Sequence, residues 1–133
     1  MVCDFCEFAL DTRYPPSMNP DFILKTIKKV VASEAKNFKI LIDDWQMPYE
    51  INQNHPGVKL WVKVSKKFGA TATIKGSEGA TVITFFKKHG IPAFATGFGA
   101  HKTAHTNDEY IFVKSLVKGT KVLEEYVKAY DRL

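Results

Sequence analysis

The sequence predicts an α/β protein, because segments with helical spacing of apolar residues alternate along the chain with short segments of strand-like alternation. Two further observations favour this class. Glycine and proline separate the segments, and the 133 residues are enough for one ordinary domain with a buried core. We therefore expect a β-α-β unit followed by a helix-rich parallel α/β layer.

The first half of the chain carries the β-α-β pattern. Residues 2–14 alternate like a strand and stop at Pro15 and Pro16, which lack amide donors. Asn19 followed by Pro20 is typical of a helix N-cap with proline in the first position, so a helix is expected over 20–35. A second strand is expected over 38–47.

The second half alternates between helix and strand after a polar, proline-containing loop at residues 48–57. The helices are predicted over 58–69, 77–90 and from about 107 to the end, and the strands over 70–75 and 92–96. The loop indicates a boundary between two structural units, residues 1–51 and residues 52–133.

Composition and charge exclude several classes of function. The net charge is +5, but the lysines are spread along the predicted helices, so we expect no specific nucleic-acid partner. No apolar run approaches the roughly 20 residues that span a bilayer, and no positively charged leader is present. We therefore expect a cytoplasmic protein without a membrane partner. Cys3 and Cys6 lack the context of a redox or zinc motif and are expected to be buried or half-buried thiols.

Two loops follow predicted strands at the edge where α/β proteins bind ligands. One contains Gly76 and Ser77, and the other runs from Thr96 to Tyr110 and contains His105. Glycines let the backbone approach a ligand, but they more often serve turn geometry. A lone histidine in a loop is more often a capping or solvent residue than a metal ligand, and Arg13 is either a surface residue or an anion clamp. The remaining histidines, His55, His89 and His101, are interpreted as surface or capping residues.

The order of the motifs DTRYPP, NHPGVKL, GSEGATVITFFKKHGIPAF and AHTNDEY resembles the C-terminal part of the M20 family of zinc-dependent amide hydrolases. That family includes enzymes of the acetylornithine deacetylase, succinyl-diaminopimelate desuccinylase, aminoacylase and carboxypeptidase G2 types. The resemblance implies that residues 1–51 are half of an α+β lid that mediates dimerisation. It also implies that residues 52–133 are the last part of an α/β catalytic domain that binds two zinc ions.

The resemblance implies roles for four residues. His105 would be a zinc ligand, Arg13 would hold the carboxylate of the substrate, and Gly76 and Ser77 would line the substrate site. The substrate implied is a small N-acylated amino acid or a peptide, cleaved at its amide bond. Lys75 and Glu78 depart from the family's usual loop and leave the detailed substrate contacts open.

The comparison with this family also shows what the chain lacks. The earlier zinc ligands in an H-x-D pattern and the Glu-Glu pair with the general base do not occur in it. Its adjacent acidic pairs, at 43–44, 108–109 and 124–125, lie in other contexts, so no catalytic residue is retained. One histidine cannot hold a catalytic zinc. We therefore expect a fragment that is inactive alone, with a homo-oligomer or an N-terminal half of the enzyme as partner. The alternative is an inactive assembly module.

Overall fold

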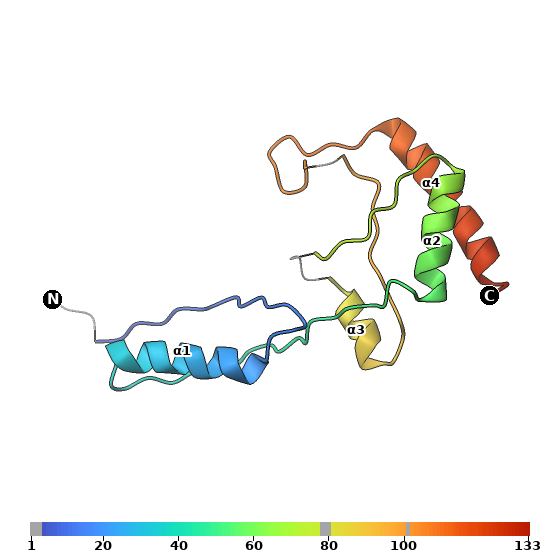
Figure 1. The fold of residues 1–133 in the computed structure, drawn as a ribbon. Helices are drawn as coiled ribbons and strands as arrows, with labels where there is room; N and C mark the ends of the chain where they lie inside the picture. The colour runs from blue at the N-terminus through green and yellow to red at the C-terminus, as the bar shows by residue number, and fades with distance from the viewer. Residues whose placement is uncertain (1–3, 78–80, 101) are drawn as a thin grey trace. The chain divides into compact units, whose positions relative to one another are not determined.

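The computed structural model describes residues 4–77, 81–100 and 102–133, and its regular elements are helices. They are α1 (Pro20–Glu34), α2 (Pro56–Lys67), α3 (Ile83–Lys88) and α4 (Val113–Tyr130) (Figure 1). The chain divides into a first unit, Met1–Glu50, and a second unit, Ile51–Leu133. Cys3, Glu78 and His101 lie outside the described residues. In the described part of the chain, no helix is both long enough and apolar enough to cross a bilayer.

The predicted α/β fold is wrong for the described residues, which contain no β-strand and so neither the α/β catalytic layer nor the α+β lid sheet. The segments expected as strands, over 4–14, 38–47, 70–75 and 92–96, carry no regular secondary structure. Alternation of side chains decides which face each residue occupies, but a strand exists only when its amides and carbonyls pair with a neighbour. That pairing depends on distant parts of a chain and is not encoded in local alternation.

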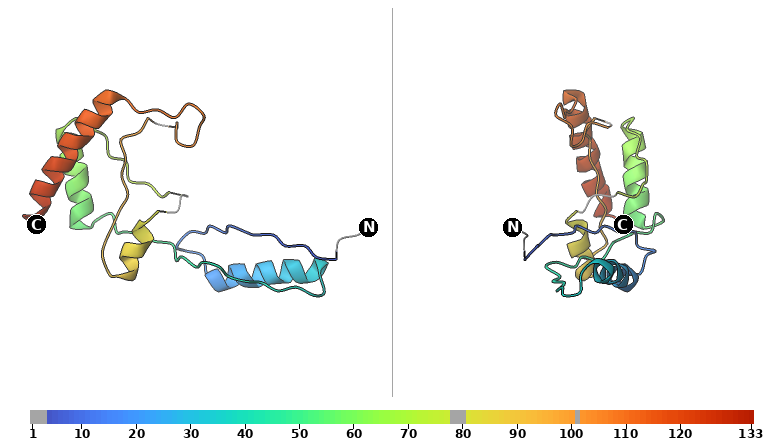
Figure 2. Two further views of the ribbon diagram at one scale, coloured as in Figure 1. Left: turned by 180° about the vertical axis from the view of Figure 1, so that it is seen from behind. Right: turned by 90° about the vertical axis from the view of Figure 1, so that its left-hand side faces the viewer.

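Helix α1 organises the first unit and agrees with its prediction to within one residue. The Oδ1 atom of Asn19 accepts a hydrogen bond from the Asp21 amide at 2.8 Å, and Pro20 occupies the first turn, where its missing donor costs nothing. Figures 1 and 2 show the segments before and after α1 running along the helix. No residue of α1 is buried, however, so the helix is held by local signals more than by a core.

Helices α2 and α4 pack against one another and form the core of the second unit (Figures 1 and 2). Trp61 and Val64 of α2 meet Val122 of α4, which is fully buried. Gly119 permits the close approach of Phe98, because an added Cβ would lie 2.5 Å from a ring carbon of that side chain. The core therefore combines one tryptophan, a glycine contact and a few β-branched residues.

The ends of three helices differ from their predictions. Helix α2 starts two residues earlier than predicted and is followed by Gly69, whose φ of +65° suits a glycine after a helix. Helix α3 is shorter than the predicted 77–90. Helix α4 begins at Val113 and not at about residue 107, because residues 107–108 form a turn and residues 109–112 are irregular. Cys6 is exposed, so the prediction of a buried or half-buried thiol is wrong there.

Candidate functional site

His105 lies in a tight turn and not at the start of a helix. Its backbone has φ of +62°, and Lys102 just before it has φ of +65°. Left-handed backbone at a residue with a Cβ costs of the order of 1 kcal/mol, although histidine tolerates it better than most residues. The His105 amide donates a hydrogen bond to Oε2 of Glu109 at 3.2 Å. Glu109 therefore stabilises this turn, and its predicted place in the first turn of the last helix is wrong.

The turn around His105 is closed by hydrogen bonds at its two ends. The Ala100 amide donates to the Tyr110 carbonyl at 3.4 Å, and the Thr103 hydroxyl donates to the Ala100 carbonyl at 3.0 Å. Between them, the Thr106 hydroxyl donates to the Thr103 carbonyl at 2.7 Å. The result is a compact loop that leaves the His105 side chain exposed to solvent.

Gly76 and Ser77 lie in the irregular segment that follows α2, and both are exposed. Among the described residues, no atom lies within 4 Å of the position that a Cβ on Gly76 would take. The backbone at Gly76 is therefore open to close approach by another molecule.

Arg13 belongs to the first unit, whereas His105, Gly76 and Ser77 belong to the second. Its guanidinium binds Asp11 through both Nε and Nη2, at 3.1 and 2.8 Å from Oδ2. The hydrogen bond, and then the charge of the partner, lowers the pKa of Asp11 and raises the pKa of Arg13. A substrate carboxylate bound by Arg13 would compete with Asp11 for the guanidinium.

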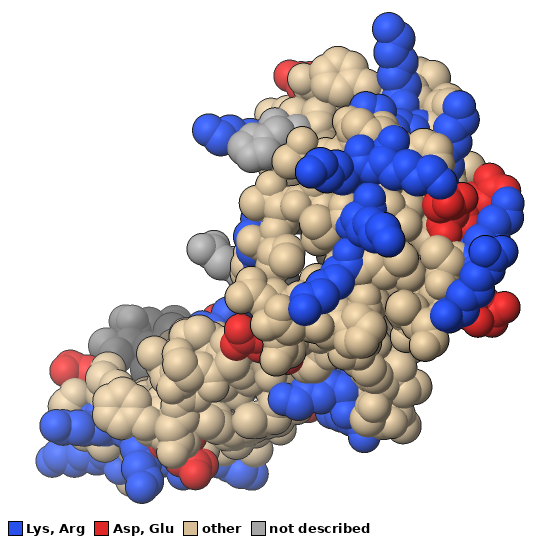
Figure 3. Space-filling view, turned by 45° about the vertical axis from the view of Figure 1, so that its right-hand side comes forward, with Lys and Arg blue, Asp and Glu red and all other residues tan. Residues whose placement is uncertain are grey.

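Charged side chains elsewhere are partly paired on the helix surfaces. Lys67 of α2 binds Glu125 of α4 at 2.6 Å, which ties together the two helices of the core. Lys128 binds Glu124 along α4 at 2.5 Å. Figure 3 shows lysine and arginine side chains spread over several elements with acidic side chains among them.

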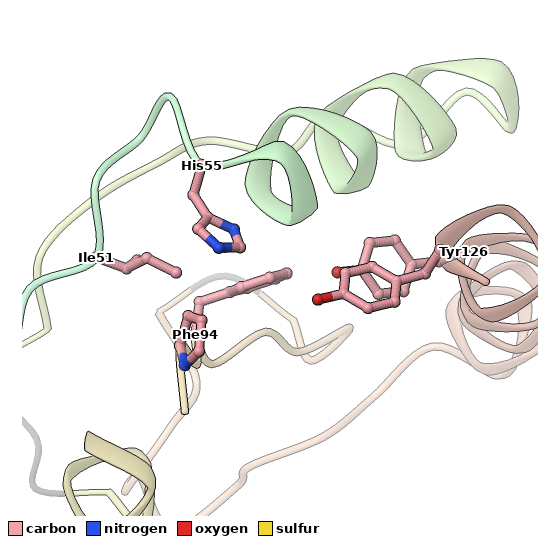
Figure 4. A pocket seen from close by; sticks show the side chains of 6 residues that line it. Ile51, His55, Phe94 and Tyr126 are labelled. Atoms are coloured by element: carbon pink, nitrogen blue, oxygen red, sulfur yellow. The ribbon is translucent and has the colours of Figure 1, made fainter. Parts of the chain in front are cut away.

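A cavity that sequence patterns did not indicate lies in the second unit. Its lining includes His55, the N-cap of α2, together with Phe94 and Tyr126, and Figure 4 shows these side chains directed toward one space. These residues are far apart in the sequence. The prediction that His55 is a capping residue is confirmed, because its side chain caps α2. Only its capping position, ahead of proline and glycine, was visible as a local signal.

Comparison with protein families gives one match, to the model described as peptidase family M20/M25/M40, over residues 25–129. This match covers well over half of the chain. The chain belongs to peptidase family M20/M25/M40. The resemblance predicted from its motifs is thus confirmed at the level of the family. Gly76, Ser77 and His105 lie inside the matched region, whereas Arg13 lies before it. Neither a curated protein nor a solved structure matches this chain.

The zinc chemistry expected of an M20 member can be tested against the residues present. A zinc site that supports hydrolysis needs about three protein ligands and one open position. No group of three or more histidine, cysteine or acidic side chains that could hold a metal exists among the described residues. His105 is exposed, and the carboxylate of Glu109 accepts a hydrogen bond from its main-chain amide. The described residues therefore do not form a zinc site on their own.

Proposed function

We propose that this chain supplies the C-terminal part of an M20 hydrolase that cleaves the amide bond of an N-acylated amino acid or a peptide. The observation that carries the proposal is the family match over residues 25–129, which includes the loop of His105. In this proposal the first unit serves as part of a lid and the second as part of the catalytic domain.

His105 would act in this enzyme as one ligand of a metal site whose other ligands come from outside these 133 residues. The turn supports that role, because hydrogen bonds at its two ends hold the loop while the imidazole stays exposed. Because the imidazole is exposed, ligands on a preceding segment or on a second chain could approach it without moving any buried side chain. The family's zinc ions, two in the intact enzyme, are expected only when those ligands are supplied.

Arg13, Gly76 and Ser77 would bind substrate. A guanidinium can present two donors to a carboxylate, and Nε and Nη2 of Arg13 already both donate to Oδ2 of Asp11. Exchange of Asp11 for a substrate carboxylate would keep the charge paired. The open backbone at Gly76 would let the acyl part of the substrate lie close to the loop.

The experiment that tests this function measures zinc content and hydrolysis of N-acetyl and N-succinyl amino acids. The chain alone is expected to show no hydrolysis, and a candidate N-terminal half with the H-x-D and Glu-Glu motifs is expected to restore it. His105→Ala should abolish the restored activity, whereas His89→Ala, at the exposed end of α3, should not. Restored activity that survives His105→Ala would contradict the role of His105.

A second candidate, a non-catalytic assembly module, is favoured by the exposed apolar side chains of the first unit. Phe5, Phe8 and Leu41 are 74, 66 and 66% exposed, and exposed apolar surface of this kind commonly marks an interface. We expect a homo-oligomer or a complex with another part of the enzyme. Light scattering tests this expectation, and a monodisperse monomer that no N-terminal half binds would contradict it.

A further inference from the structure

The cavity in the second unit has a volume of about 180 Å³ and lies between the start of α2, the end of α4 and the segment before residue 97. Its lining consists of Ile51, His55, Pro92, Phe94, Tyr126 and Tyr130. Figure 4 shows the imidazole of His55 above the ring of Phe94, with Tyr126 reaching toward them from α4. Among the residues that the structure describes, no acidic or basic side chain lines the cavity apart from the imidazole and the phenols.

Tyr126, which lines this cavity, makes edge-to-face contacts with two neighbouring rings. The ring of Tyr126 lies 6.3 Å from that of Phe94, at an interplanar angle of 87°, and 5.2 Å from that of Trp61, at 74°. Trp61 is buried in the core, so it holds the ring of Tyr126 in place. Aromatic pairs at these distances and angles are favourable, and the cavity offers the same type of contact to one more ring.

Two polar groups at the cavity, Nε2 of His55 and the hydroxyl of Tyr126, can form hydrogen bonds with a ligand. Nδ1 of His55 accepts a hydrogen bond from the Gly57 amide at 3.2 Å, so the neutral imidazole carries its proton on Nε2. The hydroxyl of Tyr126 has no hydrogen-bond partner among the described residues. Burial, and then the neighbouring Tyr130, raises the pKa of Tyr126 above its ordinary value of 10.0, so the phenol is protonated at neutral pH. It can therefore both donate and accept.

We propose that this cavity binds a small neutral aromatic ring that carries one hydroxyl group, a ligand of the phenol class. The volume is close to that of a protein cavity that holds benzene, which is about 150 Å³. The ring would contact Phe94 and Ile51, and its hydroxyl would bond to Tyr126 and to Nε2 of His55. The cavity is separate from the proposed hydrolase residues, because neither His105 nor the Gly76–Ser77 segment lines it.

The test is a fluorine NMR titration of the full chain with 4-fluorophenol, and with fluorobenzene as a ligand that lacks the hydroxyl. We expect saturable binding of 4-fluorophenol and weaker binding of fluorobenzene. Tyr126→Phe keeps the ring and removes the hydroxyl, so it should weaken 4-fluorophenol binding about fivefold, the effect of one lost hydrogen bond, and leave fluorobenzene unchanged. Tyr110→Phe is the matched control, because the ring of Tyr110 packs edge-to-face against Phe112 and does not line the cavity.

Gly57→Ala is a second variant, should the first alter folding. Its Cβ would lie 3.1 Å from the hydroxyl oxygen of Tyr126 and 3.3 Å from Nδ1 of His55, which narrows the polar end of the cavity. It should weaken 4-fluorophenol more than fluorobenzene while circular dichroism stays unchanged. The proposal is overturned by an absence of saturable 4-fluorophenol binding, or by equal losses in Tyr126→Phe and Tyr110→Phe.

Discussion

The two units of the chain each contain a well-formed helix, but the buried core residues among those that the structure describes all belong to the second unit. Helix α1 of Met1–Glu50 buries none of its residues, whereas α2 and α4 of Ile51–Leu133 enclose Trp61, Val64 and Val122. Helix α1 is amphipathic too, although less strongly than α2, so amphipathic spacing alone does not create a core. A helix is buried only where a second element presents a matching apolar face.

The largest expected effect tests this contrast with the two tryptophans. Trp61→Ala removes a side chain that is 7% exposed and should lower the free energy of unfolding by about 3 kcal/mol or more. Trp45→Ala, in the first unit, removes one that is 39% exposed and should cost far less. Urea unfolding of both variants, followed by circular dichroism, measures the difference. Equal losses of unfolding free energy in the two variants would show that packing around Trp45 stabilises the first unit as much as packing around Trp61 stabilises the second.

Gly119→Ala is expected to have the next largest effect. The added Cβ would lie 2.5 to 2.8 Å from ring atoms of Phe98, so the ring must move and the variant should lose about 1–2 kcal/mol. This loss would appear although alanine is the better helix former. Gly97→Ala is the matched control, since no described atom lies within 4 Å of the added carbon. A Gly119→Ala variant as stable as the parent in urea would contradict the close packing.

The sequence predicted those parts of the fold that depend on neighbouring residues. Asn19 and Pro20 located α1 to within one residue, because a cap and a first-turn proline act locally. The strands were wrong because their pairing partners are not adjacent in the chain. The start of the last helix was misplaced because Glu109, an acidic residue typical of a first helical turn, instead supports the left-handed turn at His105.

For the candidate site, too, the sequence predicted only what depends on neighbouring residues. His105, Gly76 and Ser77 were identified from motifs, and their family was confirmed, but no local signal revealed the hydrogen bonds that close the His105 turn. The cavity was missed because it is formed by three segments, at residues 51–55, 92–94 and 126–130, that lie more than thirty positions apart in the chain. Local patterns predict caps and turns, and contacts between distant residues must come from the folded structure.

Asn19→Ala should have a smaller effect, confined to the first unit. It removes the cap of the Asp21 amide and should cost about 1 kcal/mol of helix stability. Because α1 has no buried residue to compensate, its amides should exchange faster with deuterium while those of α2 do not change. Asn37→Ala, in the loop after the helix, is the control. Faster exchange in both units would mean that they unfold together.

The smallest expected effect concerns the Lys67–Glu125 pair that joins α2 to α4. The hydrogen bond from Lys67, and then its charge, lowers the pKa of Glu125 below its ordinary value of 4.5. A carboxylate whose pKa is lowered by folding stabilises the folded state above its unfolded pKa, and this contribution is lost as the pH falls through the folded pKa. Lys67→Met should therefore lower the urea midpoint slightly at pH 7, and the difference should shrink below pH 4.5. Lys66→Met, in the same turn, should show no such pH dependence.

Because the pair is exposed to solvent, a large difference at pH 7 would mean that α2 and α4 depend on this ion pair more than on their apolar core.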